Sequence, residues 1–303
     1  MIAREAPRTP AEPRFSQLLL AAAGLCLLVL VSFWPVVTGA RSFFHMDLYY
    51  EHIPVWEATQ RALLDHESPF WLDGEYCGHP PLFHQEAPVF YPLTVPLLRT
   101  GAPAHRLNDV FTLFHFWLAG LLAFVLLRRI GTGFLPALFG AVAWMLSARL
   151  IQSALWASAV VVCAYLPAIL LGMIQIGRGQ RRPGILTAAV AGGLALLAAR
   201  PHSLLAASPL LVTVGVGTIL TAPRRRRALG DLLVAGAIAL AIGAPSWVPS
   251  AYLYPETSRS GALPRSERDI RALADGHDLD QVFLPVDGMP RFPEPAAYPG
   301  VLP

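Results

Sequence analysis

The sequence predicts an all-α polytopic membrane protein with about seven transmembrane helices. Hydrophobic residues make up 54% of its 303 residues and charged residues only 14%, whereas a soluble domain carries about 25% charged residues. The apolar residues are grouped into long segments, and a helix that spans a bilayer needs about 20 of them. A disordered chain is excluded, because disordered chains are poor in apolar residues and rich in charge.

Seven apolar segments are the predicted spans. They cover residues 16–38, 110–127, 134–147, 153–176, 185–199, 203–221 and 232–248. The first lies in a charge-free stretch from Phe15 to Ala40, which is too long for the apolar region of a signal peptide. We therefore expect it to be a retained anchor. The third and fifth spans are the shortest.

Arginine accounts for all 23 basic residues, and its placement predicts the orientation of the chain. If the N-terminus is cytoplasmic, the inner segments hold 12 arginines and three acidic residues, and the outer segments hold 11 arginines and 17 acidic residues. Basic residues are enriched in cytoplasmic loops. We therefore expect residues 1–15 inside, and the loop 41–109 and the proline-rich segment 251–303 outside.

The composition also excludes several classes of function. Without lysine the chain can form neither a P-loop, which needs a Gly-Lys-Ser/Thr step, nor a Schiff base. The net charge of +3 is small and scattered over membrane flanks, so we expect a lipid bilayer as partner and no nucleic acid. The spans hold almost no ionisable residue, which counts against a proton pump or an ion-coupled carrier.

Polar chemistry is concentrated in the first external loop, residues 41–109, which at nearly 70 residues is long enough to suggest a function. Asp47 and Glu51 are four residues apart and would share one face of a helix. Such carboxylates could take a proton from a sugar hydroxyl or hold a divalent cation. The alternative is an acidic loop that is simply solvated. The loop's histidines fit no zinc-binding spacing.

A helix is predicted from Ile53 to about His66, because Pro54 suits a first turn and apolar residues recur on one face. It would either lie on the membrane surface or pack on the bundle. Aromatic residues of the loop, Trp56 and Tyr91 among them, fit an interfacial belt, with sugar stacking as the alternative.

Three basic side chains, Arg149, Arg200 and His202, lie near predicted span ends on the external side. Long basic side chains often anchor a helix end at the interface. The alternative is that they line a cavity and bind an anionic group, for which arginine is well suited.

The order of the loop residues supports a more specific interpretation. Asp47, Tyr50 and Pro54 precede Ser68-Pro69-Phe70-Trp71, then Gly74 and Cys77-Gly78-His79-Pro80-Pro81, and finally Phe90-Tyr91-Pro92-Leu93. This series resembles the first external loop of the bacterial YfhO-like membrane proteins, which are glycosyltransferases of the GT-C type that use lipid-linked sugars. The resemblance is sharpest over residues 44–97. The chain departs from the family at Leu72, where relatives often have asparagine.

The resemblance implies transfer of a sugar from a polyprenyl-phosphate donor to an external glycan or lipid acceptor, at the bacterial cytoplasmic membrane. Asp47 would be the catalytic base or part of a metal site. Candidates for substrate binding are Glu51, His79, Arg149, Arg200 and His202. Relatives are longer, and the last residues look like the approach to a further span, so we expect the N-terminal piece of a longer protein. Alternatives are a non-catalytic membrane protein or assembly subunit, and a carrier or lipid flippase.

Overall fold

The computed structural model describes residues 14–44, 47–71, 87–154, 156–198 and 201–253. Every regular element in these ranges is a helix. The elements are α1 (Phe15–Ser32), α2 (Trp34–Val37), η1 (Leu48–His52), α3 (Ile53–Leu64), α4 (Thr94–Leu98), α5 (Ala104–Ile130), α6 (Phe134–Met145), α7 (Ala148–Ser153), α8 (Ala157–Gly177), α9 (Arg181–Ala198), α10 (Pro201–Thr221) and α11 (Arg225–Leu253). The element η1 is a short π-helix.

The long helices confirm the predicted class, an all-α protein with several apolar helices suited to a membrane. Within the described ranges, α1, α5, α8, α10 and α11 contain stretches long and apolar enough to cross a bilayer. The helix α6 is apolar but has only 12 residues. The helix α9 begins with Arg181 and Arg182 and is not among the five. The count of seven spans therefore stays a prediction.

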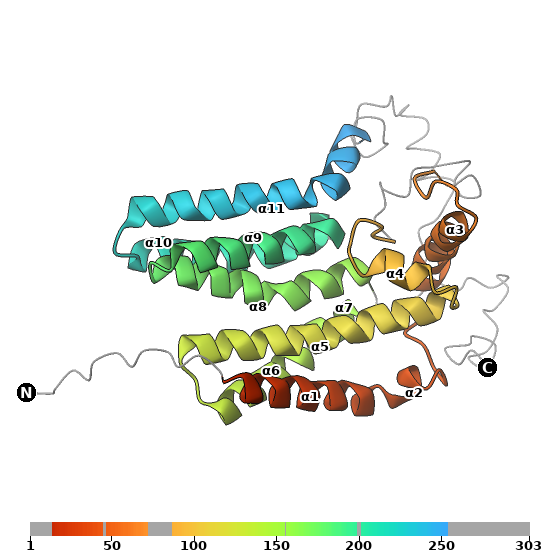
Figure 1. Cartoon of the computed structure of the whole chain (residues 1–303), viewed down its shortest axis with the longest axis horizontal. Coiled ribbons are helices and arrows are strands. Elements are labelled where there is room, and N and C mark those ends of the chain that lie inside the picture. The colour runs from red at the N-terminus through yellow and green to blue at the C-terminus, as the bar shows by residue number, and fades with distance from the viewer. Residues whose placement is uncertain (1–13, 45–46, 72–86, 155, 199–200, 254–303) are drawn as a thin grey trace, which may run out of the picture.

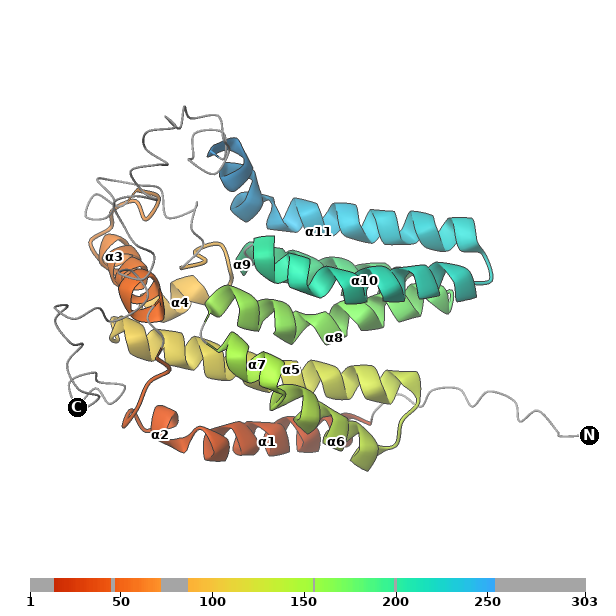
Figure 2. The ribbon, with the colours of Figure 1, turned by 180° about the vertical axis from the view of Figure 1, so that it is seen from behind.

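The helices form an elongated bundle in which helices that follow one another in the chain run in opposite directions (Figures 1 and 2). Contacts run from α1 to α5, α8, α9 and α11 in turn, while α6 packs on α5 and α10 on α8. One end of the bundle carries α2, α3 and α4, and we call it the loop end. The other carries the turns before α1, α6, α9 and α11, and we call it the basic end.

The basic end gathers the arginines that the charge pattern assigns to the inside. Their described members are Arg14, Arg128, Arg129, Arg178, Arg181, Arg182, Arg224, Arg225, Arg226 and Arg227. These residues come from four separate parts of the sequence, and the alternating direction of the helices places all of them at this end (Figure 1). The fold thus gathers ten of the described arginines at one end of the bundle, where Asp231 is the one described acid.

Two predicted spans differ from the structure because the chain forms a separate short helix there. The first is broken at Phe33, which separates α1 from α2. The fourth, predicted to begin at residue 153, starts later, because Ser147 caps a separate short helix, α7. The Ser147 hydroxyl accepts a hydrogen bond from the Leu150 N–H at 3.3 Å, which is the usual role of serine at a helix start.

Glycines allow α8 and α9 to approach each other closely. A Cβ added at Gly172 would lie 2.5 Å from the Ala188 nitrogen and 2.7 Å from the Gly184 carbonyl oxygen. In membranes, close approach of small residues is a main source of helix–helix attraction. Glycines also allow close packing of α9 and α11, where Gly193 lies against Ile242 and Gly243 lies against Leu196.

Candidate active site at the loop end

The helix α3 packs on the bundle through contacts with α5. Trp56 is fully buried, and its ring lies 5.6 Å from that of Phe111 on α5, edge to face. Tyr91 is also buried, and its ring meets that of Phe111 edge to face at 5.6 Å. Trp56 and Tyr91 are therefore core residues, and their assignment to an interfacial aromatic belt is wrong. The prediction failed for these two residues because buried and interfacial aromatics look alike in sequence.

The short helix η1, which continues directly into α3, has one buried and one exposed side. Leu48 and His52 are buried, whereas Asp47 at its start and Glu51 within it are exposed. The rings of Tyr49 and Tyr50 are about half exposed and meet edge to face at 5.3 Å. Two carboxylates and two aromatic rings are thus presented together to solvent. Single-turn π-helices are frequent at functional sites.

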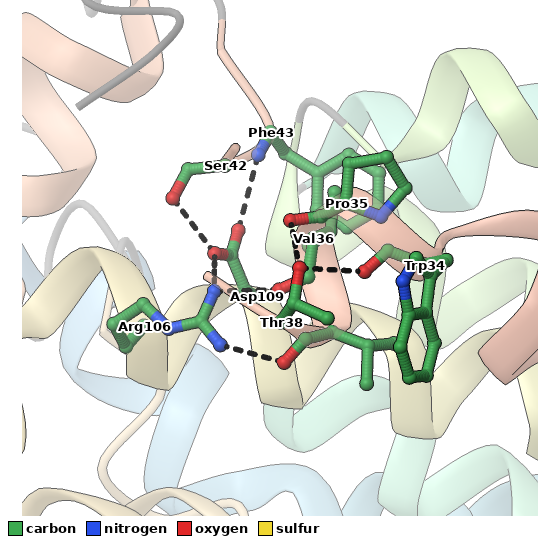
Figure 3. Close-up of polar contacts among 9 residues, drawn as sticks. Trp34, Pro35, Val36, Thr38, Ser42, Phe43, Arg106 and Asp109 are labelled. Carbon is green, nitrogen blue, oxygen red and sulfur yellow. Dashed lines mark hydrogen bonds and ion pairs between the residues drawn. The ribbon is translucent and has the colours of Figure 1, made fainter. Parts of the chain in front are cut away.

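The start of the loop is fixed by Asp109, a buried residue near the beginning of α5 (Figure 3). Its carboxylate accepts hydrogen bonds from the Ser42 hydroxyl at 2.8 Å and the Phe43 N–H at 3.1 Å. Arg106 binds the same carboxylate at 3.1 Å and donates to the carbonyls of Val36 and Val37 at 2.6 and 3.1 Å. This network joins α2, the loop start and α5 just before η1.

The end of the loop is fixed by a chain of three buried or half-buried side chains. The Tyr91 hydroxyl lies 2.8 Å from His115 Nε2 on α5 and 2.9 Å from the Tyr165 hydroxyl on α8. His115 Nδ1 lies 2.6 Å from the Phe111 carbonyl oxygen, which can only accept. The Nδ1 atom therefore carries the proton, the Tyr91 hydroxyl donates to Nε2, and Tyr165 donates to Tyr91.

A third attachment holds the middle of the loop. The Gln60 amide on α3 donates to the carbonyls of Leu98 and Ala102, both at 3.0 Å. It joins α3 to the later part of the loop, while Trp56 packs α3 on α5, so η1 and α3 are held beside the bundle. Asp47 and Glu51 consequently project from a supported element, which is what a catalytic or binding group requires.

The predicted site residues are only partly brought together. Asp47 and Glu51 share one turn, while Arg149 lies exposed on a different element, α7. His202 belongs to the first turn of α10. His79 and Arg200 lie outside the described residues. Among the described residues, no three histidine, cysteine, aspartate or glutamate side chains gather to hold a metal ion.

Three polar residues on α5 were not singled out from the sequence. Asn108, Thr112 and His115 are buried and follow one another at intervals of four and three residues, so they form one polar stripe. Thr112 and His115 lie inside the predicted span 110–127, and Asn108 lies just before it. Polar residues at helical spacing in a predicted span are the signal that could have revealed this stripe. The side chains of Asn108 and Thr112 have no hydrogen-bond partner among the described residues.

Comparison with known proteins gave no match, either to a family model, to a curated protein or to a solved structure.

Proposed function

We propose that this protein is a membrane glycosyltransferase of the GT-C type, similar to the YfhO-like proteins, that transfers a sugar from a polyprenyl-phosphate donor to an external acceptor. The proposal includes seven spans, formed by α1, α5, α6, α8, α9, α10 and α11, a cytoplasmic basic end and an external loop end. The multi-pass helical bundle and the order of the loop motifs support it.

The observation that carries the proposal is the exposed side of η1. Asp47 and Glu51 project there beside the half-exposed rings of Tyr49 and Tyr50. Carboxylates serve as general bases, and the combination of an apolar ring face with a polar edge suits an amphipathic ligand such as a sugar. The three loop anchors keep this surface next to the bundle, where a lipid-linked donor would arrive.

In the proposed reaction, the Asp47 carboxylate takes the proton from an acceptor hydroxyl. The acceptor oxygen then bonds to the anomeric carbon of the donor, and the bond from that carbon to the phosphate oxygen breaks with its electron pair. Polyprenyl phosphate leaves as an anion, which Arg149, Arg200 or His202 would bind. Two carboxylates alone make a poor cation site, so no step of this proposal depends on a metal.

The test is sugar transfer by the whole chain in membrane vesicles supplied with undecaprenyl phosphate carrying radiolabelled glucose or mannose. We expect label to move into the envelope fraction, and Asp47→Asn to lower the rate by about 100-fold or more, because general-base catalysis contributes at least that much. The matched control is Asp65→Asn, an exposed acid just after α3, which should leave the rate unchanged.

Transfer by Asp47→Asn at the wild-type rate would remove Asp47 from the mechanism. No transfer by the wild-type chain from any donor in such a panel would contradict the enzymatic function itself and favour a non-catalytic membrane subunit.

A further inference from the structure

A positively charged cavity of about 340 Å³ lies at the basic end, between the ends of α8, α9, α10 and α11. Arg181, Arg224 and Arg227 line it together with one acid, Asp231. The Nε atom of Arg181 donates to Asp231 at 2.7 Å, so this pair is already neutralised. Arg224 and Arg227 leave the cavity with an excess of two positive charges.

A second cavity, of about 300 Å³, lies further along the same four helices and is entirely apolar. Only Ala, Gly, Val, Leu, Ile and Met residues line it. Small residues on α9 and α11 create the hollow, namely Ala188, Gly192, Ala195, Ala235, Gly236 and Ala239. Within a bilayer, such a hollow is a place for a hydrocarbon chain.

The two cavities are neighbours. On α11 the consecutive residues Asp231 and Leu232 line one each, and on α8 Ile176 and Met173 are separated by about 4.5 Å along the helix axis. The apolar cavity extends along α8 from Met173 to Val162, which is about 17 Å. This length is close to half of the ~30 Å hydrocarbon core of a bilayer, which is the thickness of one leaflet.

We propose that these cavities together bind one anionic phospholipid of the leaflet at the basic end. Its phosphate would lie between Arg224 and Arg227, and one acyl chain would occupy the apolar cavity. Arginine pairs strongly with phosphate, and basic pockets between transmembrane helices at the cytoplasmic side bind anionic headgroups. The site lies at the opposite end of the bundle from Asp47, so it is distinct from the proposed donor site.

The first test compares lipids on the purified full chain in neutral detergent micelles. Phosphatidylglycerol and phosphatidylcholine with the same acyl chains are titrated separately, and bound lipid is counted by native mass spectrometry. We expect phosphatidylglycerol to bind about tenfold tighter or more. The double variant Arg224→Gln with Arg227→Gln should remove that preference. Its matched control is Arg225→Gln with Arg226→Gln, which removes the same charge from residues that do not line the cavity.

The second test fills the apolar cavity. Gly236 lines it, and a Cβ there meets no atom within 4 Å, so Gly236→Leu should fold and reduce phosphatidylglycerol binding by about tenfold. Gly230→Leu is the control, because Gly230 lies on the same helix, also has open space, and does not line the cavity.

Two outcomes would overturn the proposal. If the control pair Arg225→Gln with Arg226→Gln weakens phosphatidylglycerol binding as much as the test pair does, the preference arises from diffuse surface charge and not from the cavity. If glycerol phosphate alone competes fully and Gly236→Leu has no effect, the basic cavity is a site for a free phosphate ester and not for a lipid.

Discussion

At the scale of single residues, Tyr91 and Asp109 hold the loop between α2 and α5 in place. Burial raises the pKa of the Tyr91 hydroxyl, and the neighbouring Tyr165 adds to the effect, so Tyr91 stays protonated and can donate to His115. The sequence pointed to Tyr91 through its motif, but not to its partners, because His115 and Tyr165 are 24 and 74 residues further along the chain. Contacts at such separations follow only from the packing of helices.

Replacing Tyr91 by phenylalanine tests this anchor. The change leaves the buried Nε2 of His115 without its donor, and an unsatisfied buried group costs about 1–3 kcal/mol. We expect Tyr91→Phe to lower the Tm of the purified protein, measured by intrinsic fluorescence in detergent. Tyr49→Phe is the control, because that ring is half exposed and a surface substitution changes stability by less than ~0.5 kcal/mol. Equal Tm values for the two variants would show that the Tyr91 hydroxyl does not fasten the loop.

At the scale of elements, the apolar segments of the sequence predicted where the helices lie, and a described helix lies over most of each predicted span. Their ends were less predictable. The break at Phe33 and the separate helix α7 depend on local capping and packing, which an apolar run does not encode. The close contact of α8 with α9 could not be predicted from the sequence either. Gly172 and Gly184 can be recognised as contact residues only once the two helices are placed together.

The effect of an alanine substitution on the Tm distinguishes a glycine at a close helix–helix contact from a glycine with open space around it. At Gly172 the new Cβ would meet the backbone of α9, and overpacking of this kind costs about 1–3 kcal/mol. At Gly217 in α10 a Cβ meets nothing within 4 Å, and alanine gains roughly 0.5–1 kcal/mol in a helix interior. We therefore expect Gly172→Ala to lower the Tm in detergent and Gly217→Ala to leave it unchanged or raise it. A Tm for Gly172→Ala at or above that of Gly217→Ala would contradict the close packing of α8 and α9.

At the scale of the whole molecule, the bundle separates two kinds of chemistry. Exposed carboxylates and aromatic rings occupy the loop end, and clustered arginines occupy the basic end (Figure 1). The charge pattern predicted this separation. The sequence could not reveal the two cavities of the further inference. Residues from four helices line the apolar cavity, and the ends of the same helices line the basic cavity. Both proposals made for this protein require that the two ends face opposite sides of a membrane.

The most direct test of that claim is cysteine labelling in intact cells with a membrane-impermeant maleimide. The native cysteines are first replaced, as Cys26→Ala, Cys77→Ala and Cys163→Ala, and one new cysteine is added at an exposed position of each end, Glu67→Cys or Arg225→Cys. We predict that Glu67→Cys is labelled in intact cells and that Arg225→Cys is labelled only after permeabilisation. Labelling of Arg225→Cys in intact cells, or protection of Glu67→Cys, would contradict the account.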